Sequence, residues 1–308
     1  PQTANTLVLG PWRHGGWARG DGDALGNLDF GQKTSAFYRE QIEFPFFMKH
    51  LKGVDVVMPR AWVFETGRNE WHKHEAWPPA DGKGVNYYLN AGGSLSTSAP
   101  RAADPSADEY VADPGKPVPY LGYVNMGMRG DYMTEDQRFA SSRPDVLVYE
   151  TKALESDVRT LGPVKVRLQV SSSATDADFV VKLIDVYPGD APNLRPQGDP
   201  RPANAVVMGG YQQLVRGEPF RAKFRRSMEK PEPLTPGKVE TIEFEMPDIA
   251  HTFRPGHKIM VQVQSSWFPL VDRNPQKFMD IGKAADADFV KATHKIHRGS
   301  SVTLNVVP

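Results

Sequence analysis

The sequence predicts an α/β segment over residues 1–80, followed by a β-sandwich of the jelly-roll type over residues 81–308. Three observations lead to this fold class. The first 80 residues follow a strand–loop–helix–strand order, which is typical of an α/β sheet. Beyond residue 81, apolar and polar side chains alternate along many short runs, as in antiparallel strands covered on one face. Glycine and proline number 27 each, which favours short strands joined by many turns.

Local sequence pattern gives the elements of the first part. Pro45 removes a backbone donor and should kink or split the predicted helix, while Gly53 is well suited to end it. The Trp- and Pro-rich residues 71–79 mark a boundary. The expected order is a strand at 6–10, a Gly-, Asp- and Asn-rich loop at 15–31, a helix at 34–53 and a strand at 60–66.

In the second part, period-two alternation predicts strands with one polar face turned to solvent. Residues 179–186 are apolar on both faces and are expected to form a central strand. Proline- and glycine-rich connectors separate the strands, as expected for a sandwich or jelly roll. The alternating runs lie at residues 85–90, 164–170, 242–246, 259–263 and 302–306.

Composition excludes several classes of function. Basic and acidic residues both number 37, so the formal net charge is zero, which argues against a nucleic-acid or anionic-membrane partner. The chain has no cysteine, which excludes disulfides, zinc–thiolate sites and a cysteine nucleophile. No apolar run approaches the roughly 18 residues that a membrane span needs. Neither a phosphate-binding loop nor a dinucleotide fingerprint occurs, so no cofactor is predicted.

The run from Leu7 to His14 carries the strongest chemical signal. A short apolar strand leads into Gly-Pro, and a histidine follows three residues later. In α/β-hydrolases the catalytic groups come in the order nucleophile, acid, histidine, and the histidine follows a strand. His14 is therefore a candidate general base that takes the proton of a serine hydroxyl as it attacks an acyl carbon. The alternative is a loop histidine bonded to backbone.

The chain offers no matching nucleophile. No Gly-x-Ser-x-Gly elbow occurs, and Ser94 and Ser265 lack its strand–turn–helix context, so both are interpreted as structural. We therefore expect the serine and the aspartate upstream of residue 1, where the chain begins without an initiator methionine. Residues 1–80 also hold too little of a doubly wound sheet to bury both faces. An open sheet edge beside residues 6–10 and a cleft facing His14 are expected.

Other titratable residues are interpreted as structural, and no metal site is predicted. Two histidine pairs are expected on the wet surface, with a metal pair as the alternative. Two neighbouring aspartates are expected in a solvated turn, with calcium as the alternative. The sequence of residues 272–275 predicts a tight turn, which would hold the loop that contains it against the catalytic domain. The pairs are His72 and His74, His294 and His297, and Asp176 and Asp178.

An irregular segment rich in methionine and tyrosine is the candidate substrate wall. Thioethers and aromatic rings form an adaptable apolar surface, and Met126, Met128 and Tyr132 are the candidate substrate-binding residues. Ordinary packing between domains is the alternative for this segment.

Several longer runs resemble the α-amino-acid ester hydrolases, within the wider group of cocaine-esterase-like and Xaa-Pro dipeptidyl-peptidase-like serine hydrolases. The resemblance covers nearly the whole chain in the right order. It implies the C-terminal part of an α/β-hydrolase domain followed by a galactose-binding-like jelly roll. The matching runs are Gly10-Pro11-Trp12-Arg13-His14, residues 25–30, 45–47, 51–53, 142–146, 149–151, 178–186, 208–211 and 272–278, and most closely residues 256–270.

The resemblance also implies a function. It implies acyl transfer through a serine ester, without a cofactor, on esters or amides of α-amino acids that include β-lactam antibiotics. His14 matches the catalytic histidine. The implied partners are the small-molecule substrate, the N-terminal half of the same enzyme and further copies in a homo-oligomer. The implied location is the periplasm or the exterior, with the cytoplasm as the alternative.

A non-catalytic binding module is the competing hypothesis. Jelly rolls often carry sugar or protein sites with exposed aromatic platforms, and Trp267 would be the platform here. Because Trp267 follows an apolar strand, we expect it to be packed instead.

Overall fold

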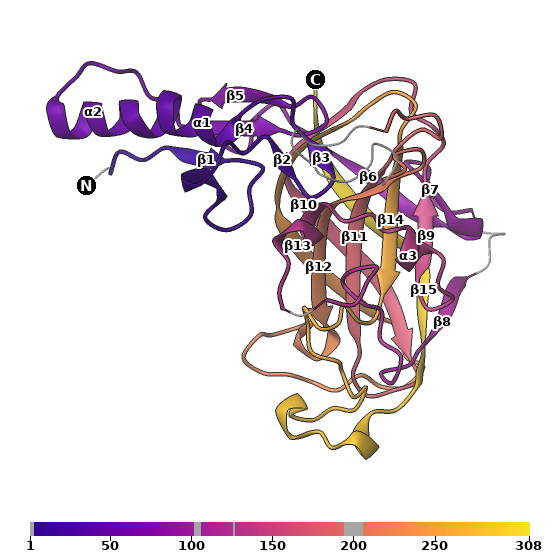
Figure 1. Cartoon of the computed structure of the whole chain (residues 1–308). Helices are drawn as coiled ribbons and strands as arrows, with labels where there is room; N and C mark the ends of the chain where they lie inside the picture. The colour runs from indigo at the N-terminus through magenta and orange to yellow at the C-terminus, as the bar shows by residue number, and fades with distance from the viewer. Residues whose placement is uncertain (1–2, 102–105, 126, 194–205) are drawn as a thin grey trace.

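A three-stranded sheet and a large β-sandwich make up the computed structural model, which describes residues 3–101, 106–125, 127–193 and 206–308 (Figure 1). The first part contains β1 (Leu7–Leu9), β2 (Ala24–Leu25), β3 (Leu28–Asp29), α1 (Thr34–Phe37), α2 (Phe44–Lys52), β4 (Ala61–Glu65) and β5 (Glu70–His74). The second contains β6 (Lys83–Asn90), β7 (Ser94–Ser96), β8 (Ala107–Ala112), α3 (Arg138–Ser141), β9 (Leu147–Glu150), β10 (Val158–Ser172), β11 (Asp178–Val186), β12 (Gln212–Arg221), β13 (Glu240–Phe253), β14 (Lys258–Gln264) and β15 (Ala292–Val307).

The N-terminal sheet has the order β1-β4-β5. β1 pairs in parallel with β4, and the chain between them returns through α1 and α2, which confirms the predicted strand–loop–helix–strand order. β1 has one neighbour among the described residues, so the expected open edge lies beside it. β5 was not predicted, because its sequence runs through Trp71 in a segment interpreted as a boundary.

The predicted helix at residues 34–53 is present but changes its pitch midway. Residues Tyr38–Glu43 form a π-helical turn between α1 and α2, directly before Pro45. Proline cannot donate to the helical ladder, so the predicted disruption occurs at the expected place. Gly53 ends α2 with a φ of 69°, and the amides of Gly53 and Val54 bond back to Lys49 and Met48. This is the glycine-terminated helix end that the sequence indicated.

The β-sandwich forms from one long run of paired strands, in the order β12-β11-β14-β9-β7-β6-β15-β10-β13, with β8 also paired to β15. β7 and β9 share a single pair, Ser94 with Glu150, so the run folds back on itself there. Buried side chains from both halves, such as Leu168 of β10 and Phe179 of β11, belong to one core cluster. The chain is therefore a mostly β-sheet protein, as expected for residues beyond 81.

Two strands of the sandwich are buried on both faces. β11 places Val181 in the main core and Val180 in a second cluster that contains Trp267, which confirms its predicted central position. The expectation of a solvated polar face is wrong for β14, where Gln262 and Gln264 are fully buried. Residues 120–121, 132–137 and 266–271 cover that face, and Gln264 donates to the Ser266 carbonyl at 2.6 Å.

The end of β4 connects the N-terminal sheet to the sandwich. The Thr66 amide donates to the Ala250 carbonyl at 3.0 Å, and the Thr252 amide donates to the Thr66 carbonyl at 2.9 Å. Glu65 is fully buried between the two sheets and receives hydrogen bonds from Arg159 at 2.8 and 3.0 Å. Thr252 donates a further bond to Glu65. A buried ion pair therefore fixes the position of one sheet on the other.

Candidate active site around His14

His14 lies exposed on the loop that follows β1, at a cleft of about 650 Å³. Met128 and Tyr132 line the same cleft, so the structure brings together residues that are more than 110 positions apart in the sequence. Met126, the other candidate, lies outside the described residues. The cleft thus has one wall from the N-terminal segment and one from the sandwich.

Trp12 determines how the loop presents His14. The Trp12 ring folds over Gly10, where any Cβ would collide with it. Its indole nitrogen donates to the Thr34 hydroxyl at 2.8 Å, and its ring packs against Trp71 at 5.8 Å between centroids. Because Trp12 is anchored on both sides, the loop is held in place and His14 points away from the core.

The sandwich wall of the cleft is fastened to the N-terminal segment. Thr134 donates through its hydroxyl to the Leu25 carbonyl at 3.1 Å. A Cβ at Gly130 would lie 2.9 Å from the Arg13 side chain, so a small residue is needed at this close approach. Tyr132 packs edge-on against Trp267, with ring centroids 5.8 Å apart. These contacts fix the distance between His14 and the apolar wall.

Two smaller cavities adjoin the cleft. One of about 250 Å³ lies between the N-terminal sheet and the sandwich, and one of about 230 Å³ follows β12. Met133 lines all three cavities, which makes them neighbours. We call this series the interlobe groove. Sequence reasoning missed it because β12 carries no clear alternation and was not predicted as a strand.

Carboxyl groups in the wall next to the cleft have shifted pKa values. Burial, reinforced by the neighbouring Asp131 and Asp136, raises the pKa of Glu135 to about 7. The hydrogen bond from Arg129 lowers the pKa of Asp131, although burial acts in the opposite direction. The wall therefore combines an aspartate that stays ionised with a glutamic acid that titrates near neutral pH.

A hydroxyl, two imidazoles and a carboxylate form a hydrogen-bonded chain that reaches the wall of the groove. His251 contacts the Thr66 hydroxyl at 2.8 Å and Asp185 at 3.3 Å, and His257 contacts the other oxygen of Asp185 at 2.8 Å. Burial tends to raise the pKa of Asp185, but hydrogen bonds from both histidines outweigh it and lower the pKa. The Asp185 carboxylate and the His251 ring are buried, whereas Thr66 and His251 also line the cavity of about 250 Å³, so this chain links the sheets and borders the groove.

Two predictions about surface residues are wrong. His294 was expected on the surface, yet it is fully buried between Tyr110 and Phe179, with both ring nitrogens lacking a hydrogen-bond partner. Its partner in the predicted pair, His297, instead contacts the Ser171 hydroxyl at 2.9 Å. The pattern failed because β15 turns His294 toward the core.

The aspartate pair is also not solvated. Asp178 receives hydrogen bonds from Arg221 at 2.9 and 3.0 Å and from Asn274 at 2.7 Å. Asp176 accepts from the Lys223 amide at 3.2 Å, and burial together with Asp178 raises its pKa. The two carboxylates hold loops to the end of the sandwich.

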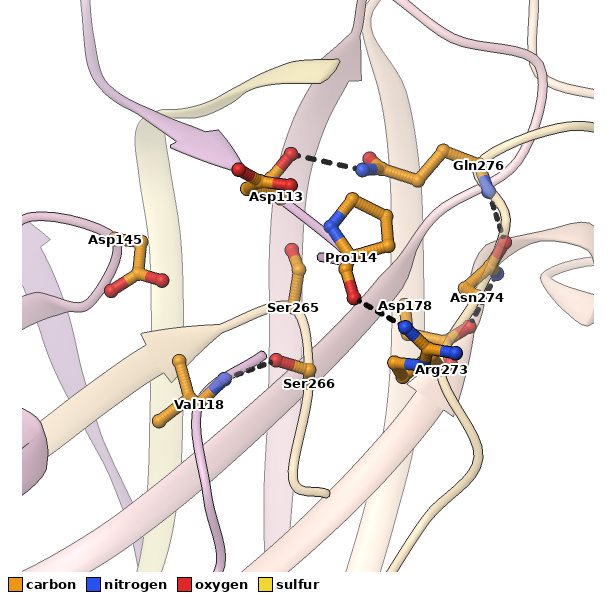
Figure 2. Close-up of a pocket in the computed structure, with 11 residues that line it drawn as sticks. Asp113, Pro114, Val118, Asp145, Asp178, Ser265, Ser266, Arg273, Asn274 and Gln276 are labelled. Atoms are coloured by element: carbon orange, nitrogen blue, oxygen red, sulfur yellow. Dashed lines mark hydrogen bonds between the residues drawn. The ribbon is translucent and has the colours of Figure 1, made fainter. Parts of the chain in front are cut away.

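Figure 2 shows a small cavity beside Asp178. The cavity has a volume of about 10 Å³, which suits a single water molecule. Arg273 donates to the Pro114 carbonyl at 3.0 Å, which pins the turn at residues 272–275 within the sandwich, and its expected contact with the catalytic domain stays a prediction. Ser265 pairs with Tyr110, and Ser266 accepts from the Val118 amide, which confirms that Ser265 is structural.

The remaining candidates occupy ordinary structural positions. His72 and His74 lie on one face of β5, partly buried, with ring centroids 6.4 Å apart. The described residues contain no group of three acidic or histidine side chains arranged for a metal ion. No helix in the described part of the chain is both long and apolar enough to cross a bilayer. Trp267 is buried, as expected, and offers no platform for a sugar.

Comparison with solved structures identifies close relatives of the whole chain. An aminopeptidase from a marine sediment Thaumarchaeota archaeon is 38% identical, with a TM-score of 0.89, over 98% of this chain and 49% of its own. An α-amino acid ester hydrolase is also 38% identical, with a TM-score of 0.89, over 98% of this chain and 50% of its own.

Sequence comparison agrees with the structural one. The cocaine esterase of Rhodococcus sp. (strain MB1 Bresler) is 34% identical over 98% of this chain and 50% of its own length. The chain therefore spans about half the length of the relatives it matches. The family resemblance inferred from the sequence is confirmed. Residues 56–306 match the model of the X-Pro dipeptidyl-peptidase C-terminal non-catalytic domain, and the chain belongs to that family.

Proposed function

We propose that this chain is the C-terminal half of a serine hydrolase of the α/β-hydrolase type. Residues 1–80 complete its catalytic domain, and residues 81–308 form a jelly roll that walls the active site. The observation that carries the proposal is the exposed His14, on a loop after an edge strand, at a cleft shared with the sandwich. The match to the non-catalytic domain begins at residue 56, so His14 lies outside it, while residues 56–80 of the proposed catalytic segment lie within it.

His14 is the proposed general base. Its imidazole takes the proton from the hydroxyl of a serine in the N-terminal half as the oxygen attacks the acyl carbon. The ring then returns the proton to the leaving alcohol or amine, and a water molecule repeats the cycle to release the acid. Met128 and Tyr132 contact the apolar part of the substrate. The serine and the aspartate of the triad come from outside this chain.

The proposed substrates are esters or amides of α-amino acids, among them β-lactam antibiotics. The similarity to an α-amino acid ester hydrolase supports this class. A dipeptidyl-peptidase-like or cocaine-esterase-like preference is the alternative, and the match to cocaine esterase supports it. A panel of α-amino-acid esters, Xaa-Pro amides and benzoyl esters distinguishes the three by kcat/KM.

An apolar face on α2 supports the proposed partner. Phe44, Phe47 and Leu51 recur at helical spacing and are 62%, 51% and 73% exposed. α2 projects away from the sandwich (Figure 1), and the edge of β1 is open on the same part of the chain. We propose that the N-terminal half of the enzyme covers this face, because the relatives are about twice as long as this chain.

The test uses the full-length enzyme that contains this chain. A fluorophosphonate probe should label it, and His14→Ala should lower ester hydrolysis by about a thousandfold or more while unfolding stays unchanged. His297→Ala is the matched control, since this histidine lies in the sandwich, bonded to Ser171, and should keep full activity. Wild-type turnover in His14→Ala would refute the assignment.

Export to the periplasm or the exterior, and self-association, are further proposals that rest on the resemblance alone. Cell fractionation of the native host tests the first. Light scattering of the full-length enzyme tests the second.

A further inference from the structure

Arg216 is the cation of the interlobe groove. It lies on β12, which ends the strand order of the sandwich, and it lines both smaller cavities of the groove. Leu214 and Met133 line the same two cavities, so the charge sits among apolar side chains. Met133 also borders the His14 cleft, so the two cavities beside Arg216 are neighbours of that cleft.

The hydrogen-bonding capacity of Arg216 is largely unused. A guanidinium carries five N–H donors. Within the described residues, one of them is satisfied, by a 2.7 Å bond from Nη2 to the Asp248 backbone carbonyl. Nε is buried and has no hydrogen-bond partner. The Arg216 side chain is half-buried, and a partly desolvated guanidinium with unused donors favours a ligand that supplies acceptors.

Within the described residues, neither nearby acid forms an ion pair or a side-chain hydrogen bond with this fork, although the charges of Glu218 and Asp248 act on it. The Asp248 carboxylate accepts a 2.6 Å hydrogen bond from the Trp77 indole, so its backbone carbonyl, and not its side chain, meets Arg216. Glu218 lies two residues along β12, and burial raises the pKa of its carboxyl despite the opposing effect of Arg216. Burial lowers the pKa of Arg216, although the charges of Glu218 and Asp248 act in the opposite direction.

We propose that Arg216 binds a carboxylate carried by the substrate at its end remote from the scissile bond. The inference rests on the proposed function, since His14 marks the reacting end of the groove. The planar guanidinium presents two parallel N–H groups that match a carboxylate, and the apolar walls fit the body of a small organic acid. The enzyme therefore prefers anionic esters or amides over uncharged ones of the same shape.

A binding experiment tests the site without requiring catalysis. Benzoate and benzamide have nearly the same shape but differ in charge, and isothermal titration of the 308-residue chain compares them. We expect benzoate to bind more tightly than benzamide. Arg216→Gln should weaken benzoate binding about tenfold and leave benzamide unchanged, with Arg216→Lys between them because Lys keeps the charge but loses the fork.

Arg167→Gln is the control for lost positive charge, because this arginine is exposed and paired with Glu243. Equal binding of benzoate by wild type and Arg216→Gln overturns the subsite, provided that circular dichroism shows both folded. So does equal binding of benzoate and benzamide by the wild-type chain.

A kinetic experiment in the full-length enzyme connects the subsite to the reaction. The substrates are the 4-nitrophenyl and 3-carboxy-4-nitrophenyl esters of alanine. Arg216→Gln should lower the kcat/KM ratio of the anionic to the neutral ester about tenfold, through KM, with the neutral ester unaffected. An unchanged ratio refutes the role in the reaction. If wild type hydrolyses neither ester and takes no fluorophosphonate label, the proposed function is refuted, and the benzoate titration then decides the subsite independently.

Discussion

His294 is a polar residue that occupies a fully buried, apolar position. Its imidazole is fully buried, and both nitrogens lack hydrogen-bond partners. The ring instead packs edge-on against Tyr110 and Phe179, at 5.5 and 5.6 Å between centroids. Burial lowers the pKa of His294 to about 4, so the ring is neutral near pH 7. It acts as an aromatic core residue that has two unsatisfied polar atoms.

Replacing this ring with an apolar side chain should stabilise the protein. His294→Phe removes the unsatisfied nitrogens and should raise the free energy of unfolding by about 1–2 kcal/mol at pH 7.5. His294→Leu is the second variant, in case the longer phenyl ring does not fit. Urea unfolding followed by circular dichroism measures the change, and a loss of stability in both variants would contradict the interpretation.

His294→Phe should also change how the stability of the protein depends on pH. The pKa of His294 in the folded state lies below the ordinary value of about 6.5. The contribution of the neutral ring to the free energy of unfolding is therefore complete above pH 6.5 and is lost as the pH falls toward 4. Wild type should lose about 2 kcal/mol of this contribution between pH 7.5 and pH 5, and His294→Phe should not. His297→Gln is the control and should keep the acid sensitivity.

At the scale of elements, the end of β4 is the critical connection. Glu65 is buried between the N-terminal sheet and the sandwich, where Arg159 of β10 and Thr252 of β13 bond to it. Thr66 continues the connection through the backbone of β13 and through His251. These bonds come from strands far apart in the sequence, so no local pattern could indicate them.

Breaking the ion pair between Glu65 and Arg159 should weaken the attachment of the N-terminal sheet to the sandwich and lower the free energy of unfolding. Glu65→Gln leaves Arg159 without its carboxylate and should destabilise the chain by about 3 kcal/mol in chemical unfolding. Glu70→Gln on the adjacent strand is the matched control, because that carboxylate is largely exposed and should change stability by less than about 0.5 kcal/mol. A cost for Glu65→Gln as small as that of the control would show that the connection does not depend on the ion pair.

For the molecule as a whole, the apolar face of α2 lies uncovered. Phe44, Phe47 and Leu51 form one side of the helix, and most of each side chain is exposed. Contiguous exposed apolar patches of this kind mark interaction surfaces or promote association. In the proposed enzyme the face lies against the N-terminal half.

The isolated chain should therefore self-associate, and charge on α2 should prevent it. Phe47→Glu combined with Leu51→Lys should shift the isolated chain toward monomer in sedimentation velocity at rising concentration. In the full-length enzyme the same pair should lower thermal stability, because charges would then lie in a buried interface. Val111→Lys, an exposed apolar position on β8, is the control and should change neither. Unchanged self-association of the α2 variant would exclude this face as the surface through which the isolated chain associates.

The sequence by itself determined the elements whose signal is local. Alternation identified most of the long strands, the doubly apolar run identified β11 as central, and Pro45 and Gly53 marked where the helix changes and ends. The strand–Gly-Pro–His pattern was also enough to single out His14, and the family resemblance followed from ordered runs along the whole chain.

Only the tertiary structure decided which residues meet and which are covered. It placed Met128 and Tyr132 beside His14, buried the polar face of β14, and turned His294 and Asp178 inward. It also revealed Arg216 in the groove, although nothing in the sequence of β12 distinguishes that arginine from exposed ones. The physical reason is that periodicity reports which side of a strand a residue occupies, whereas burial and contact depend on what distant segments pack over that side.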